Sequence, residues 1–296
     1  MSSRHVSAAI GSLVVVLGGL LAVAPSLAEE SYDVLPDQVY VERDSGPLKS
    51  DVYVPHGDGS FPAMIVVHGG AWASGTKAQL AGIAEGLAKQ GYTAAAISYR
   101  LAPQDKFPAQ VYDCQAAVRW LRANAQKYKV DPDHVGGYGY SAGGHLVAML
   151  GALDDDQLRE PGLADDAPSA RLQVVVAGGA PCDFRMLSPD SGRLAYWLGG
   201  TPGEKPEAYR DASPASYVTA DDPPMFFFHG TADDIVPIRS PQRMVEKLKA
   251  AGVTCEIREI PEAGHMGAVV DRDAMLDALA FVNRNLRSQP KAVDGE

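Results

Sequence analysis

The sequence predicts a three-layer α/β fold, in which an eight-stranded and mostly parallel sheet carries helices on both faces. From Ala63 onward, short apolar runs alternate with longer amphipathic runs, as in a parallel sheet with crossover helices. The run at 63–67 is apolar throughout, which is typical of a strand covered on both faces. Each candidate functional motif follows one of the expected strands, and ligands bind beyond the carboxyl ends of such strands.

The expected elements can be taken in chain order. Residues 29–36 read as a loose lead-in, and alternating apolar residues then predict two antiparallel edge strands, joined by a turn at Ser45-Gly46-Pro47. The eight expected strands are 38–43, 50–54, 63–67, 93–98, 135–138, 172–177, 225–228 and 254–260. Helical periodicity predicts helices at 79–90, 109–128, 142–153, 241–250 and 272–285.

These elements form one predicted domain over residues 29–288, with an insertion at about 154–222. The insertion begins as an acidic loop and continues, from residue 183, as a proline-rich stretch with short helical pieces. We interpret Asp154-Asp155-Asp156 as a solvated charge run, because the spacing of a calcium loop is missing. Residues 289–296 are expected to be a disordered tail.

The first 28 residues resemble a secretory signal peptide. Arg4 supplies a positive start, residues 6–23 are apolar, and small residues precede a predicted cleavage after Ala28. A retained membrane anchor is the alternative, but the apolar run is short and a good cleavage site follows it. We therefore expect a secreted or periplasmic protein with no stable membrane association after cleavage.

Composition narrows the partners and cofactors. A net charge of −11, without a local cluster of Lys and Arg, disfavours nucleic-acid binding. Of the three cysteines, Cys114 lies in an apolar helix pattern and Cys255 in an expected strand, so both are expected to be small buried residues. Three cysteines can form at most one disulfide, and whether any two of them do so is left open. No spacing resembles a zinc site, and no metal or cofactor is expected. The oligomeric state stays open.

Gly139-Tyr140-Ser141-Ala142-Gly143 matches the G-x-S-x-G pattern between an expected strand and an expected helix. A nucleophilic serine in this position needs a very tight turn, and bulk at the flanking glycines would collide with neighbouring backbone. The free N–H groups of the following helix favour negative charge. We therefore predict Ser141 as the nucleophile and its neighbour Tyr140 as a substrate contact.

His68-Gly69-Gly70-Ala71-Trp72 follows the strand at 63–67 and predicts an oxyanion hole. Glycines let the backbone pass close to a substrate and direct N–H groups into the site. We assign the hole to the N–H groups of Gly70, Ala71 and Ala142. His68 is expected to brace the loop, and Trp72 either contacts substrate or packs in the core.

The predicted acid and base follow later strands. Asp233 and Asp234 end the motif that begins at His229, and we choose Asp233 because the partner of a catalytic histidine is buried. His265 lies on an expected loop between Gly264 and Gly267, where its ring can reach a neighbouring strand end. The order Ser141, Asp233, His265 is the order of the α/β-hydrolase triad.

With these residues in place, the chain from about 50 to 286 resembles the α/β-hydrolase esterase superfamily. It is most similar to hormone-sensitive-lipase-like carboxylesterases and bacterial feruloyl or acetyl esterases. The matching stretches are Tyr99-Arg100-Leu101-Ala102-Pro103, Ser213-Pro214, Asp222-Pro223-Pro224 and the motif from His229 through Val236-Pro237. The resemblance places the family aspartate on Asp233.

Two departures from the family pattern concern the acyl pocket. Lipase-like members usually have a third glycine where this chain has Ala71, and many have Phe where Gly267 follows Met266. We interpret Tyr99-Arg100, in contrast, as a buried structural contact.

The sequence therefore predicts an exported serine carboxylesterase that acts through a Ser-His-Asp triad and an acyl-enzyme. Its expected substrate is a short-chain, acetyl or feruloyl ester, either a small molecule or linked to a polysaccharide. A peptidase or amidase of the same fold is one alternative, and a non-catalytic binding protein on this scaffold is another.

Overall fold

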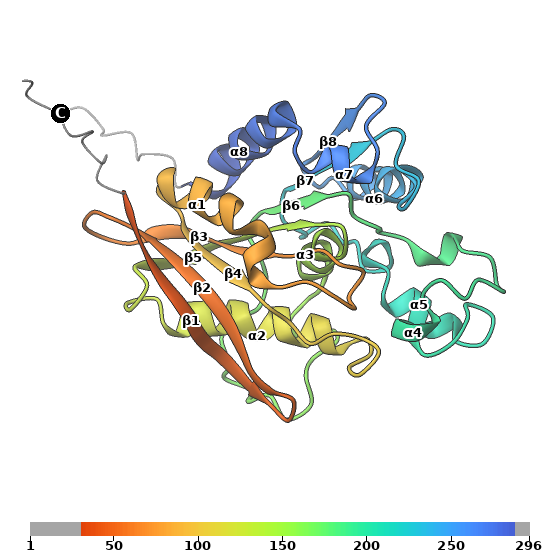
Figure 1. The fold of residues 1–296 in the computed structure, drawn as a ribbon, viewed down its shortest axis with the longest axis horizontal. Helices are drawn as coiled ribbons and strands as arrows, with labels where there is room; N and C mark the ends of the chain where they lie inside the picture. Colours follow the sequence, from red (N-terminus) through yellow and green to blue (C-terminus); the bar gives the residue numbers. More distant parts are fainter. Residues whose placement is uncertain (1–30, 288–296) are drawn as a thin grey trace, which may run out of the picture. The chain divides into compact units, whose positions relative to one another are not determined.

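One eight-stranded sheet organises the computed structural model, which describes residues 31–287 (Figure 1). Its strand order is β1-β2-β4-β3-β5-β6-β7-β8, in which β1 and β2 pair antiparallel with their neighbours and all later pairs are parallel. The predicted α/β-hydrolase fold class is thereby confirmed. The expected signal peptide and tail lie outside the described residues.

The strands are β1 Tyr32–Arg43, β2 Gly46–Pro55, β3 Phe61–Val67, β4 Thr93–Ile97, β5 Val130–Tyr140, β6 Val175–Gly178, β7 Met225–Gly230 and β8 Cys255–Ile260. The α-helices are α1 Ala81–Lys89, α2 Ala109–Ala123, α3 Ala142–Ala152, α4 Ala195–Leu198, α5 Pro206–Asp211, α6 Arg239–Ala250, α7 His265–Ala268 and α8 Arg272–Leu286. Short 3-10 helices are η1 Lys77–Leu80, η2 Phe184–Met186 and η3 Pro214–Ser216. The pieces η2, α4, α5 and η3 belong to the predicted insertion, and α4 and α5 lie at the right of Figure 1.

The two faces of the sheet carry separate apolar clusters. Along β3, Ala63, Ile65 and Val67 belong to one cluster, whereas Met64 and Val66 belong to the other. Side chains alternate between faces along a strand, so a continuous apolar run buries both faces at once. Helices α2, α3 and α6 pack on the first face and α1 and α8 on the second. This arrangement makes the three layers that the sequence predicted.

Several predicted boundaries were wrong. The described part of the expected lead-in at 29–36 is not loose, because β1 begins at Tyr32, which pairs with Pro55 across the antiparallel edge and is itself buried. Helix α2 ends at Ala123 instead of 128, and a turn through Lys129, with φ of 52°, leads into the earlier start of β5. Pairing between strands set these limits, and local periodicity does not report pairing.

Side-chain contacts resolve two further expectations. Tyr99 donates a hydrogen bond to the carbonyl of His68 at 3.0 Å, so this part of the Tyr99-Arg100 pair is a buried structural contact as expected. Asp154 is paired with Arg171 and Asp155 accepts a hydrogen bond from the Ala170 N–H at 2.7 Å. The acidic run is therefore partly tied down and is not purely solvated.

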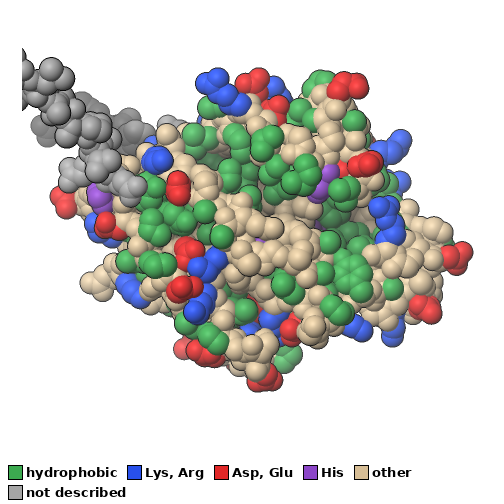
Figure 2. Space-filling view, viewed as in Figure 1, with side chains coloured by type: hydrophobic (Ala, Val, Ile, Leu, Met, Phe, Trp, Pro, Cys, Tyr) green, Lys and Arg blue, Asp and Glu red, His purple; other side chains and the backbone are tan. Residues whose placement is uncertain are grey.

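The described chain also bears on charge, thiols and membranes. Figure 2 shows Lys and Arg side chains interspersed with Asp and Glu on the face in view. Cys114, Cys182 and Cys255 are free thiols, the first two of them buried. Among residues 31–287, no helix has both the length and the apolar character needed to cross a bilayer.

Asp113, on α2, links the end of β1 to the loop after β4. Its side chain is fully buried and accepts hydrogen bonds from Arg43 Nε at 2.9 Å and from Arg100 Nη2 at 2.8 Å. Asp113→Ala leaves both guanidinium groups without this partner, so we expect the free energy of unfolding to fall by about 3 kcal/mol. Urea unfolding followed by circular dichroism measures it. The exposed Asp58→Ala is the control, and an equal loss in both variants contradicts the assignment.

Candidate active site

Ser141 occupies a tight turn between β5 and α3. Its backbone φ of 56° and ψ of −120° is strained for a residue with a side chain. A Cβ at Gly139 would lie 2.2 Å from the Gly143 carbonyl oxygen, and one at Gly143 would lie 1.9 Å from the Val67 carbonyl oxygen. Only glycine fits at these two positions. This contact explains the spacing of the G-x-S-x-G motif and fixes where the hydroxyl of Ser141 projects.

The structure brings the three predicted triad residues together. His265 Nε2 lies 2.9 Å from Ser141 Oγ, and His265 Nδ1 lies 2.6 Å from Asp233 Oδ2. The residues follow β5, β7 and β8, whose carboxyl ends lie at one edge of the sheet. His265 was expected on a loop, but it begins the short helix α7. Gly264 precedes it in an extended conformation that lets the chain turn into the helix.

Asp233, and not its neighbour Asp234, holds the histidine. The Asp233 side chain is fully buried, whereas Asp234 is exposed. Burial by itself raises the pKa of Asp233. Hydrogen bonds from His229, His265 and the Val236 N–H outweigh this effect and hold the pKa well below its usual range. Asp233 is consequently a carboxylate at neutral pH and can accept the Nδ1–H of His265.

His229 is a positioning residue that the sequence analysis did not assign. Its Nε2 lies 3.2 Å from Asp233 Oδ2 and 2.8 Å from the Val236 carbonyl oxygen, with the ring fully buried. The other oxygen of Asp233 accepts N–H groups of Ile235 and Val236 at 3.0 and 2.8 Å. The spacing of four residues between His229 and Asp233 was the signal in the sequence that could have suggested this contact.

The predicted oxyanion loop lies against the nucleophile turn. A Cβ at Gly69 would lie 3.0 Å from the Tyr140 carbonyl oxygen and 3.3 Å from Ser141 Cβ. Gly70 and Ala71 both have positive φ, of 111° and 50°. Within residues 31–287, the N–H groups of Gly70, Ala71 and Ala142 donate to no protein acceptor. All three groups therefore remain available beside Ser141.

His68 braces this loop, as its sequence context suggested. Its ring stacks on Tyr99 with centroids 4.2 Å apart, and its Nδ1 lies 2.7 Å from the Gly69 carbonyl oxygen. Burial lowers the pKa of His68. A neutral ring with Nδ1 protonated accounts for this contact.

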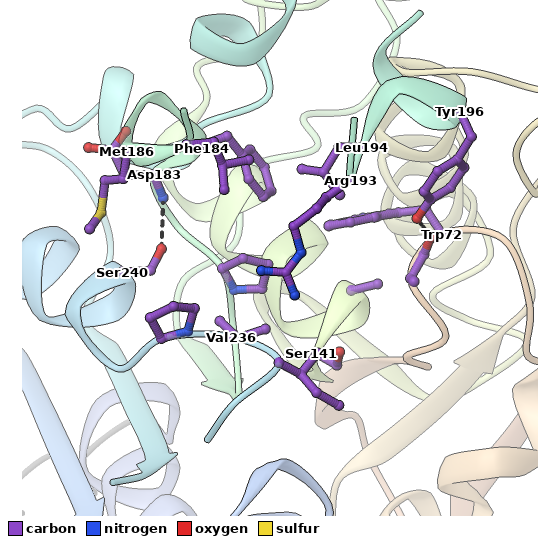
Figure 3. Close-up of a pocket in the computed structure, with 16 residues that line it drawn as sticks. Trp72, Ser141, Asp183, Phe184, Met186, Arg193, Leu194, Tyr196, Val236 and Ser240 are labelled. Carbon is purple, nitrogen blue, oxygen red and sulfur yellow. Dashed lines mark hydrogen bonds between the residues drawn. The ribbon is translucent and has the colours of Figure 1, made fainter. Parts of the chain in front are cut away.

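A cavity of about 340 Å³ opens above Ser141 (Figure 3). Its walls come from the oxyanion loop, the nucleophile turn, the insertion and the segment after Asp233. The lining residues are Ala71, Trp72, Ser141, Ala142, Pro181, Asp183, Phe184, Met186, Leu187, Arg193, Leu194, Tyr196, Ile235, Val236, Pro237 and Ser240. Most are apolar, so these walls suit the hydrocarbon part of an acyl or aryl group. Sequence reasoning found only four of the lining positions, because the insertion has no regular pattern.

The two predicted substrate contacts have different positions. Trp72 lines the cavity and stacks on Trp197 with centroids 3.8 Å apart and planes 2° apart. Tyr140 does not line it, so that prediction was wrong. As the last residue of β5, Tyr140 points to the other face of the sheet, beside Phe228, and its hydroxyl donates to the His265 carbonyl. Tyr140 thus supports the chain at His265.

His145 is a second residue that the sequence analysis missed. It lies on α3 one turn after Ser141, where its Nδ1 accepts a hydrogen bond from Trp72 Nε1 at 3.2 Å. Its Nε2 donates to the Ala212 carbonyl at 2.7 Å. The ring therefore ties the oxyanion loop and the insertion to the nucleophile helix. Burial lowers the pKa of His145 to about 4, so the ring is neutral near pH 7.

No metal-binding cluster of three or more His, Cys, Asp or Glu occurs within the described part of the chain. The polar groups around Ser141 instead form a hydrogen-bonded series from hydroxyl to imidazole to carboxylate. Such a series can transfer a proton from the serine hydroxyl and so activate it as a nucleophile.

A family model described as BD-FAE matches residues 50–248. The chain belongs to the BD-FAE family. Among curated proteins, Esterase LipC of Mycobacterium tuberculosis is 33% identical over 211 residues, which are 69% of this chain and 52% of LipC. The chain spans about half the length of the curated relatives it matches first.

Solved structures of esterases superpose on this chain. A truncated carbohydrate esterase from gut microbiota superposes with a TM-score of 0.78 at 28% identity, covering 87% of this chain and 98% of that one. An esterase of Thermogutta terrifontis with propionate bound gives 0.74 at 27% identity, covering 88% and 97%. The resemblance to α/β-hydrolase esterases of the hormone-sensitive-lipase-like group is thereby confirmed.

The buried His145 predicts how stability depends on pH. Because its folded pKa of about 4 lies below the usual value near 6.5, the unfolded chain binds more protons between these values. The contribution of His145 to the free energy of unfolding is therefore fully present above about pH 6.5. It falls toward pH 4, by up to about 3 kcal/mol. Urea unfolding across this range measures the loss.

Two variants assign the effect. His145→Gln should lose less stability than the unchanged protein as the pH falls through this window. His56→Gln, at an exposed histidine, should keep the full pH dependence. An unchanged pH dependence in His145→Gln would refute the assignment.

Proposed function

We propose that this BD-FAE protein is a serine carboxylesterase that hydrolyses esters through a covalent acyl-enzyme. The observation that carries the proposal is the hydrogen-bonded series Ser141–His265–Asp233, whose serine lines a mostly apolar cavity. Its relatives and structural neighbours named above are themselves called esterases. We further propose the export that the first 28 residues suggest, into the periplasm or out of the cell.

The first half of the reaction forms the acyl-enzyme. His265 Nε2 accepts the proton of Ser141 as Ser141 Oγ attacks the ester carbonyl carbon. Asp233, ionised and hydrogen-bonded to Nδ1–H, fixes the ring orientation and stabilises the imidazolium that results. The carbonyl oxygen gains negative charge in the tetrahedral intermediate, and the free N–H groups of Gly70, Ala71 and Ala142 stabilise it.

The second half releases the acid. The intermediate collapses, the C–O bond to the alcohol breaks, and the His265 imidazolium gives its proton to the departing alkoxide. Water then enters, gives a proton to His265 and attacks the acyl carbon. The second tetrahedral intermediate expels Ser141, which recovers its proton, and the free acid leaves. Each proton is taken up and returned by the same imidazole.

The cavity supports small acyl groups. Its volume of about 340 Å³ lies at the lower end for small-molecule sites. Trp72, Phe184 and Leu194 give it apolar walls, which suit a short aliphatic or single-ring acyl group. We therefore propose short-chain, acetyl or feruloyl-type esters, free or carried by a polysaccharide. Amide hydrolysis would require the same groups, but no observation at this site favours it.

Replacing the nucleophile tests the proposal directly. We expect Ser141→Ala to lower kcat for 4-nitrophenyl esters, assayed from acetate to laurate, by at least about 10³-fold. The acyl-length profile of the unchanged protein should peak at short chains, because the cavity is small. Circular dichroism checks that the variant is folded. Turnover that persists in folded Ser141→Ala would overturn the triad assignment.

Two adjacent aspartates offer a matched comparison. Asp233→Asn removes the carboxylate that orients His265, so we expect kcat to fall by about 10³- to 10⁴-fold. Asp234→Asn makes the same chemical change at the exposed neighbour and should leave kcat close to that of the unchanged protein. Steady-state kinetics with 4-nitrophenyl acetate measures both. A larger loss in Asp234→Asn would reverse the assignment.

A further inference from the structure

One charged side chain in the cavity has no partner in the protein. Arg193 lies in the insertion between η2 and α4, and its guanidinium group points into the cavity toward Ser141 (Figure 3). Within residues 31–287, Arg193 makes no ion pair and no hydrogen bond. A guanidinium group in this place can therefore bind a substrate group without first releasing a protein partner.

The other polar side chains that face the cavity are already engaged. The Tyr196 hydroxyl donates to the Ala71 carbonyl at 2.7 Å, and Trp72 Nε1 donates to His145. Ser240 Oγ accepts from the Cys182 N–H at 2.8 Å. Arg193 is thus the charged side chain of the described lining for which neither a hydrogen bond nor an ion pair exists.

The carboxylate of Asp183, the acidic group among these lining residues, does not balance Arg193. The Asp183 side chain is 4% exposed and accepts hydrogen bonds from Arg185 Nε at 2.7 Å and Nη2 at 2.8 Å. Arg185 therefore neutralises Asp183 from outside the cavity. The cavity lining therefore presents one uncompensated positive charge, on the exposed side chain of Arg193, in a chain whose net charge is −11.

We infer that the cavity selects esters that carry a carboxylate, and that Arg193 is the residue that recognises it. This inference rests on the proposed esterase function and names its substrate class. The planar guanidinium group can bind a carboxylate with two parallel hydrogen bonds, which fixes the orientation as well as adding charge attraction. The negative charge of the whole chain gives no general attraction for such a substrate, so recognition depends on this one group.

The test compares esters matched in length. For a carboxylate on the acyl part, 4-nitrophenyl hexanoate is compared with the 4-nitrophenyl monoester of adipate. For a carboxylate on the alcohol part, the acetate of methyl 4-hydroxybenzoate is compared with the acetate of 4-hydroxybenzoate. Within each pair, the ratio of kcat/KM for the charged ester to that for the neutral ester reports recognition of the carboxylate.

In at least one pair, we expect Arg193→Met to lower this ratio by about tenfold. Arg193→Lys keeps the charge but not the fork and should keep part of the ratio. The control is Arg210→Met, which removes an exposed charge of the insertion that pairs with Asp211 and is absent from the cavity lining. It should keep the ratio of the unchanged protein.

Salt gives an independent measurement. Raising the ionic strength from about 0.01 M to about 1 M should lower the ratio in the unchanged protein, whereas the ratio of Arg193→Met should not fall, because salt there screens only the repulsion from the acidic chain.

The outcomes separate the two proposals. Hydrolysis of neutral esters with the same ratio in the unchanged protein and Arg193→Met, in both pairs, overturns the inference and leaves the esterase function standing. Arg193 is then a solvated surface arginine. Loss of the ratio in Arg210→Met as well would also overturn it, since net charge would account for the effect. If the folded protein hydrolyses no ester of either pair, the esterase proposal and the inference fail together.

Discussion

The site depends on how closely backbone approaches backbone at the turn around Ser141. Gly139, Gly143 and the carbonyl of Val67 leave no room for a Cβ, so β5, α3 and β3 meet there almost without side chains. The contact forces Ser141 into its left-handed conformation, and the surrounding sheet and helix keep it there. A looser turn would let the backbone relax and withdraw the hydroxyl from His265. The parallel sheet thereby fixes the position of Ser141 Oγ.

Around Ser141, a short chain of hydrogen bonds orients the residue that is proposed to transfer protons. In the proposed reaction His265 transfers protons, and its orientation comes from Asp233, which His229 and two N–H groups hold in turn. Burial alone would raise the pKa of Asp233 and favour its neutral form, so the hydrogen bonds from His229, His265 and the Val236 N–H are what keep it charged and able to stabilise an imidazolium. Tyr140 supports the same histidine through its backbone carbonyl. The charged transition state thus finds its dipoles already in place.

The insertion supplies much of the cavity wall. Trp197 stacks on Trp72 of the oxyanion loop, and His145 joins that tryptophan to the Ala212 carbonyl. The insertion and the catalytic loop are therefore packed as one unit, and a change in one is expected to be felt in the other. Most of the wall is apolar and most of its polar groups are paired internally. Arg193 differs from both kinds of neighbour, which is why it carries the argument for an anionic substrate.

The sequence determined the fold class and the order of the elements, and it pointed to Ser141, Asp233 and His265, which the structure brings together, and to the glycine loop beside them. Each of these leaves a local signature: continuous apolar runs, glycines where backbone must touch backbone, and polar residues after strands. Tertiary structure alone decided that β1 starts at Tyr32, that Tyr140 faces away from the cavity, and that His145, His229 and Arg193 belong to the site. Those facts depend on strand pairing and on contacts between residues far apart in the chain, and neither periodicity nor motif spacing records such contacts.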